Sequence, residues 1–308
     1  MSRFFANSFL EPKLSTPDTR QHSSWYNTRL KVGVHVSISG SIDQAVDRAK
    51  EEGCDTFQVF TRNPRGWKFA DLDLDEVKSF KEKLGQSNLG PVVDHMPYLP
   101  NLSCPEDELY EKSTATLLAE VDRCGTLGIP YLVCHLGSHL GMGRDVGLQR
   151  ITDALNIAVK RVRKDPWILL ENMAGQRNSM GSNFPDIREI IDGVKKRERL
   201  GVCLDTCHAY AAGMDLHTEK GVAQTLTSFD KDIGFDKLKV VHLNDSRGGQ
   251  GSGLDRHEHI GMGYIGAKGF KTILHHDAIR ELPWILETPE DERRDDKGNL
   301  ETVRKLAK

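Results

Sequence analysis

The chain has 308 residues, 38% of them hydrophobic, and 42 Lys and Arg against 45 Asp and Glu give a formal net charge of −3 at pH 7. This length fits either two domains of about 150 residues or one α/β barrel. The charge balance excludes a strongly basic nucleic-acid coat protein, although a local basic groove is still compatible with it. No apolar run reaches the roughly 18 residues of a membrane-spanning helix, so we expect no membrane association.

The six cysteines lie mostly inside apolar segments of a long chain. This distribution indicates reduced thiols in an intracellular protein rather than a disulfide framework. Cys203 and Cys207 flank an Asp at the end of an apolar run, and we interpret both as core residues. We expect a cytoplasmic protein, or a nuclear or mitochondrial one in a eukaryotic cell.

The first residues differ from the rest of the chain. Residues 1–29 have no helical or strand period and combine two Pro with many Ser, Thr and Asn. They lack the apolar stretch of a secretory signal, and Glu11 and Asp18 are untypical of a mitochondrial presequence. We therefore expect a flexible extension over 1–29 and one catalytic domain over 30–308.

From residue 31 onward, short apolar runs alternate with amphipathic stretches. The apolar runs are typical of buried strands and lie at 31–36, 55–61, 91–95, 130–136, 166–171, 201–205, 238–243 and 283–287. Helical periodicity predicts helices at 41–52, 75–84, 107–128, 145–162, 184–194, 218–229, 267–275 and 299–307. Strand–helix units in unbroken succession predict an α/β protein with a single (β/α)8 TIM barrel. An open doubly wound sheet is disfavoured, because no GxGxxG follows an early strand.

Seven of the eight predicted strands end in a His, Asp or Glu: His35, His95, His135, Glu171, Asp205, His242 and Glu287. The carboxyl ends of barrel strands meet at one mouth, where the active sites of this fold lie. A single such side chain would more often be a hydrogen-bonded polar group than a ligand. Several carboxylates together would repel one another and lose solvation unless a cation neutralised them. The pattern therefore predicts a metal site at the C-terminal mouth.

Two further motifs add candidate ligands. His208 follows the strand-end Asp205 by three residues, and Asp255 and His257 have the spacing that lets an extended loop chelate one ion. The Gly-rich stretch 248–253 fits a loop that folds over a site, or a plain flexible linker. The candidate ligands are then His95, His135, Glu171, Asp205, His208, His242, Asp255, His257 and Glu287. Mixed nitrogen and oxygen donors suit Zn²⁺, with Mn²⁺ or Fe²⁺ as alternatives, and so many donors fit three ions better than one or two.

A cluster of divalent ions about 3.5–4 Å apart activates a water and holds both the attacking and the leaving oxygen of a phosphoryl displacement. The sequence has no Walker A loop, no serine nucleophile elbow and no HExxH motif. Nucleoside-triphosphate hydrolysis, acyl-serine chemistry and zincin proteolysis therefore lack their parts. From the residues alone we predict metal-assisted hydrolysis of a phosphate ester.

Several segments resemble the signature segments of the endonuclease IV family. In chain order they are His135-Leu-Gly-Ser-His139, Glu171-Asn-Met-Ala-Gly-Gln176, Gly201-Val-Cys-Leu-Asp-Thr-Cys-His208, Val241-His-Leu-Asn-Asp245, Asp255-Arg-His257, Gly261-Met-Gly263 and Ile285-Leu-Glu-Thr288. The resemblance implies a trinuclear zinc enzyme of base excision repair that cleaves DNA on the 5′ side of abasic sites. It leaves a 3′-hydroxyl and a 5′-deoxyribose phosphate, and also trims blocked 3′ ends. The implied partner is double-stranded DNA with such lesions, and we expect a monomer.

The same resemblance assigns roles to the candidate ligands. It implies that one zinc is held by His95, His135 and Glu171. Glu171 would bridge to a second zinc, which is completed by Asp205, His242 and Glu287. The third zinc would be held by His208, Asp255 and His257. The nucleophile would be a hydroxide between the first two ions, with Glu171 and Glu287 as catalytic carboxylates, and His35 would orient the mouth from behind the ligands.

Family loops that bend the duplex and flip the abasic nucleotide are matched at three positions. Arg65, Tyr98 and Leu99 would act there as wedges that fill the gap left by the flipped nucleotide. Taken without the resemblance, Tyr98 and Leu99 would more often be packed loop anchors. The chain departs from the family pattern, without losing a candidate ligand, at Gly66, Leu136, Met173 and Arg247.

Two other functions are weighed against this one. A sugar isomerase or epimerase of a related barrel would hold a single divalent ion with Glu171, Asp205, His242 and Glu287. It would leave the other candidate ligands without a role, and a metal count separates the two. A catalytically silent DNA-binding barrel is disfavoured, because desolvated polar groups cost stability unless a metal occupies them.

Overall fold

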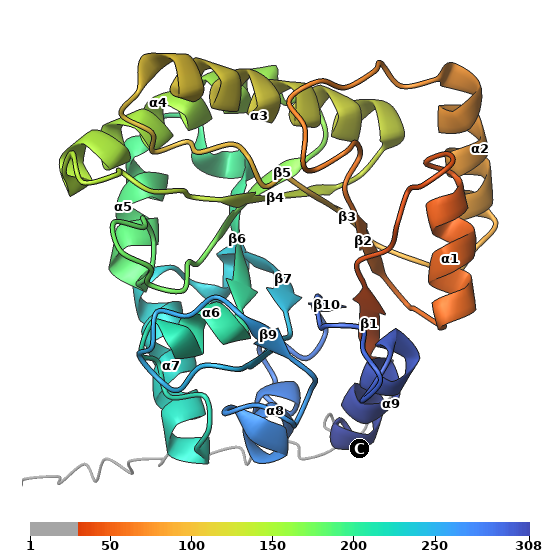
Figure 1. Ribbon diagram of the computed structural model, residues 1–308, viewed down its shortest axis with the longest axis vertical. Coiled ribbons are helices and arrows are strands. Elements are labelled where there is room, and N and C mark those ends of the chain that lie inside the picture. Colours follow the sequence, from red (N-terminus) through yellow and green to blue (C-terminus); the bar gives the residue numbers. More distant parts are fainter. Residues whose placement is uncertain (1–29) are drawn as a thin grey trace, which may run out of the picture.

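The computed structural model describes residues 30–308, which form a barrel of parallel strands surrounded by helices (Figure 1). The predicted extension over 1–29 lies outside the described residues. The strands pair in the order β1-β10-β7-β6-β5-β4-β3-β2. Their bounds are β1 Lys31–Val34, β2 Phe57–Val59, β3 Val92–His95, β4 Tyr131–His135, β5 Trp167–Glu171, β6 Leu200–Asp205, β7 Leu238–His242 and β10 Pro283–Leu286. A parallel bridge between His35 and Gln58 joins β1 to β2, so the predicted TIM barrel is confirmed.

Apart from the short helix α6, the helices follow the strands at the predicted places. They are α1 Gln44–Glu52, α2 Leu74–Gly85, α3 Asp107–Leu127, α4 Arg144–Arg161, α5 Phe184–Gly193, α6 Thr206–Ala211, α7 Glu219–Asp232, α8 Gly266–Leu274 and α9 Asp296–Leu306, with 3-10 turns η2 Arg197–Arg199 and η3 Phe235–Lys237. Side-chain caps explain where several helices begin. At the start of α2, the Asp73 side chain accepts from the backbone of Asp75 and Glu76, and at the start of α7 the Thr218 side chain accepts from the backbone of Gly221. None of the helices in residues 30–308 has both the length and the apolar character that crossing a membrane requires.

Two features of the mouth are absent from the predicted elements. Helix α6 begins directly at the end of β6, and a small antiparallel pair joins β8 Asp245–Ser246 to β9 His257–Glu258. The Gly-rich stretch 248–253 connects these two short strands. Gly251 and Gly253 donate backbone hydrogen bonds to the carbonyls of Tyr210 and Ala211 at the end of α6. The stretch is therefore fixed against α6, and its interpretation as a plain flexible linker is wrong.

The contact between β1 and β2 depends on a residue without a side chain. A Cβ on Gly33 would lie 1.6 Å from the backbone oxygen of Thr56, so any larger residue forces the two strands apart. We expect Gly33→Ala to lower the free energy of unfolding by about 1–3 kcal/mol, the usual cost of overpacking. Chemical denaturation measures this. The control is Gly85→Ala at the end of α2, where a Cβ meets nothing within 4 Å, so that equal losses in both variants would contradict the account.

Candidate metal centre

The candidate ligands reach the mouth because side chains along a strand alternate between two faces. A small core inside the barrel consists of Val93, Val133, Leu169, Cys203, Val240 and Ile285. A candidate ligand lies two residues after each of these core residues in the chain. These ligands are His95, His135, Glu171, Asp205, His242 and Glu287. Since residues i and i+2 of a strand face the same way, inward packing of the first set points the second set into the mouth. Cys203 is a core residue, as predicted.

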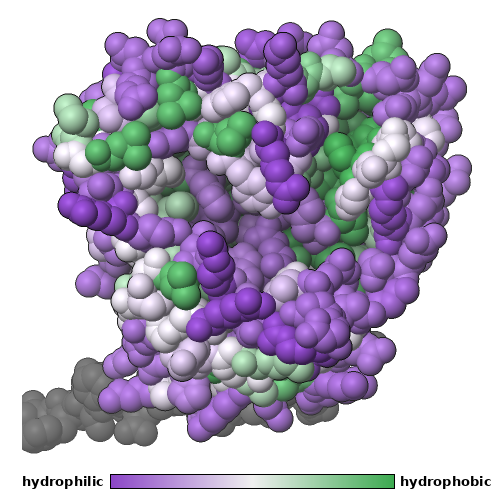
Figure 2. All heavy atoms as spheres, viewed as in Figure 1, coloured by the Kyte–Doolittle hydropathy of each residue, from purple (hydrophilic) through white to green (hydrophobic). Residues whose placement is uncertain are grey.

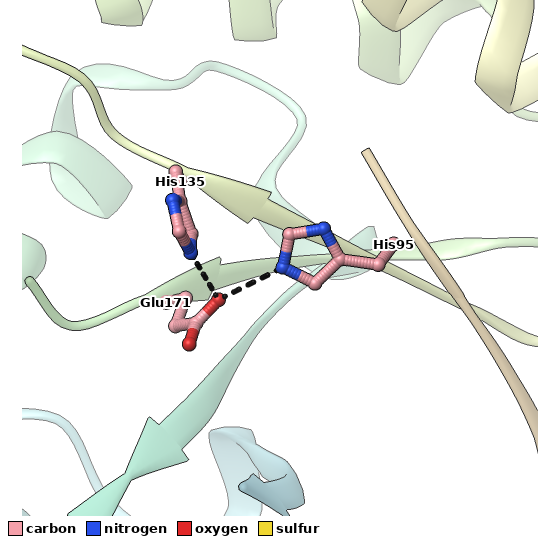
Figure 3. A group of neighbouring side chains, drawn as sticks. All are labelled: His95, His135 and Glu171. Atoms are coloured by element: carbon pink, nitrogen blue, oxygen red, sulfur yellow. Dashed lines mark hydrogen bonds and ion pairs between the residues drawn. The ribbon is translucent and has the colours of Figure 1, made fainter. Parts of the chain in front are cut away.

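The first group of donors lies on β3, β4 and β5 (Figure 3). Glu171 Oε2 is 3.3 Å from His95 Nε2 and 3.1 Å from His135 Nε2. His95 Nδ1 donates to the backbone oxygen of Met96 at 2.6 Å. Nε2 of His95 is therefore left free to face the carboxylate. One donor atom from each of the three side chains lies within 4.8 Å of the others.

The second group shares Glu171 with the first. Glu171 Oε1 is 3.0 Å from His242 Nδ1, which in turn is 3.4 Å from Glu287 Oε2. Together with Asp205, these side chains bring donor atoms within 4.8 Å of one another. The two oxygens of the Glu171 carboxylate therefore face different groups.

The third group comes from α6, from β9 and from the loop just before β9. Asp255 Oδ1 is 3.1 Å from His208 Nε2 and 3.9 Å from His257 Nε2. Asp205 caps α6 by accepting from the backbone of His208 at 2.7 Å, which turns the His208 ring toward the mouth. His257 Nε2 is buried and has no hydrogen-bond partner. A buried nitrogen without a partner, beside a carboxylate, is typical of a ligand to a cation.

The Cys207 sulfur lies within 4.8 Å of donor atoms of Asp205 and His257, so its position would allow it to bind a metal with them. Burial raises the pKa of its thiol to about 12, so the thiol keeps its proton unless a cation lies beside it. The Cys207 sulfur instead lies 3.6 Å from the backbone oxygen of Arg256. Its interpretation as a core residue is consistent with both observations.

The outward nitrogens of these imidazoles are fixed by oxygen acceptors. His208 Nδ1 lies 2.9 Å from the Asn172 carbonyl, and His257 Nδ1 lies 2.9 Å from the Glu287 carbonyl. A carbonyl can only accept, so each contacting nitrogen carries a proton, and in the neutral imidazole the opposite nitrogen has a free lone pair. This arrangement is typical of histidines that bind metal. The donor set therefore fits divalent cations.

The charges at the mouth support the same conclusion. Burial raises the pKa of Glu171, but the imidazoles of His242 and His135 outweigh burial and hold it well below its usual range. Burial likewise raises the pKa of Glu287, while His242 and His95 bring it to about 2. The carboxylates thus stay ionised as long as positive charge lies beside them. Protonated imidazoles supply that charge here, and bound cations would supply it in their place and leave the imidazoles neutral.

Gln58 is a functional candidate that the sequence did not reveal. It is fully buried on β2, and its Nε2 donates to Glu287 Oε1 at 2.6 Å. Its Oε1 is 2.9 Å from His242 Nε2, and Nε2 is also 3.1 Å from His35 Nδ1. Burial lowers the pKa of His35 to about 4, so a neutral His35 can accept this hydrogen bond. Gln58 therefore sets the orientation of His242 and Glu287 together.

Two asparagines hold Asp205. Asn244 Nδ2 donates to Asp205 Oδ2 at 2.7 Å, while its own oxygen accepts from the backbone of Glu287 at 2.8 Å. Asn172 accepts from the Asp205 backbone at 2.7 Å and donates back to its carbonyl at 3.0 Å. Neither Asn was named as a site residue from the sequence. Both lie inside the segments that carry the family resemblance, which is the one signal that could have singled them out.

The residues predicted to contact DNA lie on loops beside this centre. Arg65 and Tyr98 line the same cavity of about 740 Å³ as the candidate ligands, and Figure 2 shows a central hollow with a hydrophilic floor. Tyr98 is 58% exposed and Leu99 38% exposed. The backbone of Tyr98 donates to the Pro64 carbonyl at 3.2 Å, which joins the two loops. A large aromatic side chain thus stands at the rim of the cavity.

Comparisons with known proteins agree with this architecture. The family model for xylose isomerase-like TIM barrels matches residues 46–308. A protein of Methanoculleus marisnigri named probable endonuclease 4 is 55% identical over 277 residues, which is 90% of this chain and 98% of the relative. The probable endonuclease 4 of Nitrosopumilus maritimus is 50% identical over 280 residues, which is 90% of this chain and 100% of the relative.

Solved structures extend the comparison. Endonuclease IV from Thermus thermophilus aligns with a TM-score of 0.80 at 36% identity, over 90% of this chain and 98% of that structure. A D-tagatose 3-epimerase-like protein aligns with a TM-score of 0.66 at 18% identity, over 89% of this chain and 96% of that structure. This is a likeness of fold alone. The chain therefore belongs to the endonuclease IV family, within the xylose isomerase-like TIM barrels.

Proposed function

We propose that this chain hydrolyses the phosphodiester on the 5′ side of abasic sites in double-stranded DNA through a centre of three zinc ions. The products are a 3′-hydroxyl and a 5′-deoxyribose phosphate, and the same centre trims blocked 3′ ends. The observation that carries the proposal is the convergence of three donor groups, two of which share Glu171. Family membership makes the chain an endonuclease, and the donor groups supply the chemistry such an enzyme needs.

Each donor group is assigned one ion. The first is held by His95, His135 and Glu171, the second by Glu171, Asp205, His242 and Glu287, and the third by His208, Asp255 and His257. When bound, such ions lower the pKa of a water molecule and neutralise the charge that develops on the phosphoryl oxygens. Mixed imidazole and carboxylate donors favour zinc, with manganese or iron as substitutes.

The protein's own groups position this chemistry. Glu171 is fully buried and ionised, and its two oxygens face two donor groups. It therefore fixes their spacing and can accept a proton from a water that lies between them. Glu287 stays ionised beside Gln58, which directs one of its oxygens. Neutral His35 accepts from the same Gln58, so it orients the mouth without adding charge.

Arg65, Tyr98 and Leu99 are assigned to the DNA. A wedge must be exposed, rigid and able to replace a base in the stack. Tyr98 meets these conditions because its ring packs edge-on against Phe60 with 5.0 Å between centroids, while more than half of it is exposed. Partial burial and nearby Glu287 raise the pKa of Tyr98, so the phenol enters the stack uncharged. Arg65 adds a positive charge on the neighbouring loop.

A sugar isomerase or epimerase is the weaker candidate. It would use the second donor group alone, and the third group, with its unpartnered His257 nitrogen, would have no purpose. The epimerase-like structural neighbour is 18% identical and shares only the fold.

The direct test is incision of a duplex with one abasic site. Metal-loaded protein should cut immediately 5′ of the site, and protein stripped with a strong chelator should not cut until zinc is returned. Metal-loaded protein that fails to cut would overturn the proposed substrate. Cutting that survives complete removal of metal would overturn the proposed mechanism.

Replacing the shared carboxylate should abolish turnover without unfolding the barrel. We expect Glu171→Gln to lower kcat by more than about 100-fold, because losing a supporting group at a metal site already costs 10–100-fold. Glu290→Gln, at the rim of the same cavity, is the matched control and should keep its activity. Turnover and far-UV circular dichroism are measured for both. Near-parental turnover of the Glu171 variant would remove Glu171 from the mechanism.

The wedge side chains should affect DNA binding and not metal content. We expect Tyr98→Ala to weaken binding of an abasic duplex by about 5- to 100-fold, the range for losing one base-stacking contact. Leu99→Ala should also weaken binding, because it removes an apolar wedge. Bound metal should stay unchanged. Leu74→Ala, which removes an exposed leucine on α2, should bind like the parent. Parental affinity in the Tyr98 and Leu99 variants would refute the assignment.

A further inference from the structure

A buried network of charged and polar side chains lies behind the loop that carries Arg65. We refer to Thr61, Arg62, Glu120 and Arg123 as the loop anchor. Their exposed fractions are 2%, 4%, 0% and 9%. None of them belongs to a donor group of the mouth. The proposed chemistry therefore gives these buried charges no task.

The anchor ties the segment after β2 to α3. The Thr61 hydroxyl donates to Glu120 Oε2 at 2.5 Å and accepts from Arg123 Nε at 2.9 Å. Arg62 Nε lies 2.7 Å from Glu120 Oε1. Arg123 also donates to the backbone oxygens of Thr61 and Ala70. One side chain of α3 thus binds both ends of segment 61–70.

Phe69 closes the anchor from the solvent side. Its ring is 44% exposed and lies 4.1 Å from the guanidinium of Arg62 and 5.7 Å from that of Arg123. A guanidinium over an aromatic face is stabilised by the ring quadrupole. The ring therefore shields two charges from water and holds the far part of the segment in place.

Segment 61–70 also controls the neighbouring loop. Pro64 accepts from the backbone of Tyr98 at 3.2 Å, and Asn63 accepts from the backbone of Arg65 at 3.0 Å. Phe60, just before the anchor, packs against the rings of Tyr98 and His95 with centroids 5.0 and 5.6 Å apart. The position of the anchor thereby determines where Arg65 and Tyr98 stand at the mouth.

Buried ion pairs are costly, and an apolar filling of the same space is often at least as stable. We propose that the loop anchor is a positioning device for lesion recognition. It holds Arg65 and Tyr98 at the rim in the position that binding requires. Binding of damaged DNA therefore does not have to supply the free energy of ordering this loop. This inference rests on the proposed function, and the four residues of the loop anchor are positioning residues.

Thr61→Val tests the anchor with the smallest change in volume. The control is Thr225→Val, which removes another buried hydroxyl, one that donates to the Asp215 carbonyl on a different side of the barrel. We expect Thr61→Val to weaken binding of an abasic duplex by at least about 10-fold, a size typical of coupling between residues of one hydrogen-bond network. Bound metal and kcat at saturating duplex should stay parental. Backbone amides in 61–70 and at Tyr98 should exchange hydrogen faster, and the control should show neither effect.

Double-mutant cycles with Arg65→Ala and with Tyr98→Ala separate positioning from a general loss of stability. If the anchor acts through these two side chains, Thr61→Val should cost much less affinity in at least one of the two backgrounds than in the parent. Additive losses in both backgrounds, or a Thr61→Val variant that matches the Thr225→Val control, would overturn the anchor. The two proposals fail in different ways. A parent that does not cut abasic duplex overturns the proposed function, whereas a parent that cuts it, with a Thr61→Val variant of parental affinity, overturns only the anchor.

Discussion

A carboxylate with no exposed surface lies at the centre of the barrel mouth, and the surrounding residues keep it ionised. Glu171 faces His95 and His135 with one oxygen and His242 with the other. An ion removed from water in this way needs opposite charge on all sides. The barrel meets that need by bringing imidazoles from neighbouring strands to one point. Cations held between these donors would complete the balance, and that requirement links the fold to the proposed hydrolysis.

The donors are held by polar groups that do not themselves reach the proposed ions. Gln58 orients His242 and Glu287, and Asn244 joins Asp205 to the backbone of Glu287. Such outer contacts fix the tautomer and direction of each donor before metal or substrate binds. The loop anchor extends the same arrangement to the DNA side, where it fixes a loop instead of a ligand. A hydrogen-bonded frame around both regions would let one mouth combine the proposed lesion recognition with the proposed phosphodiester cleavage.

Much of this could be predicted from the sequence, because parallel strands buried on both faces leave continuous apolar runs with a polar residue at the end. The barrel and the placement of the strand-end candidates followed from that pattern, while their roles as ligands stay predictions. Gln58 could not be predicted as a site residue, because it lies inside an apolar run and belongs to no spaced motif. Glu120 and Arg123 lie on a long amphipathic helix, where charges are usually solvent-facing, and only tertiary packing turns them inward. The short strands beside the Gly-rich stretch, two residues each, are too brief to leave a periodic signal.

The central claim is that alternation along six strands, completed by α6, β9 and the loop before β9, builds a centre for three cations. Anomalous X-ray diffraction from crystals of the zinc-loaded protein, recorded on both sides of the zinc absorption edge, tests it most directly. The account predicts three peaks, one in each donor group, with Glu171 between two of them. A single peak among Glu171, Asp205, His242 and Glu287, with none beside His257, would contradict it and favour a one-metal isomerase.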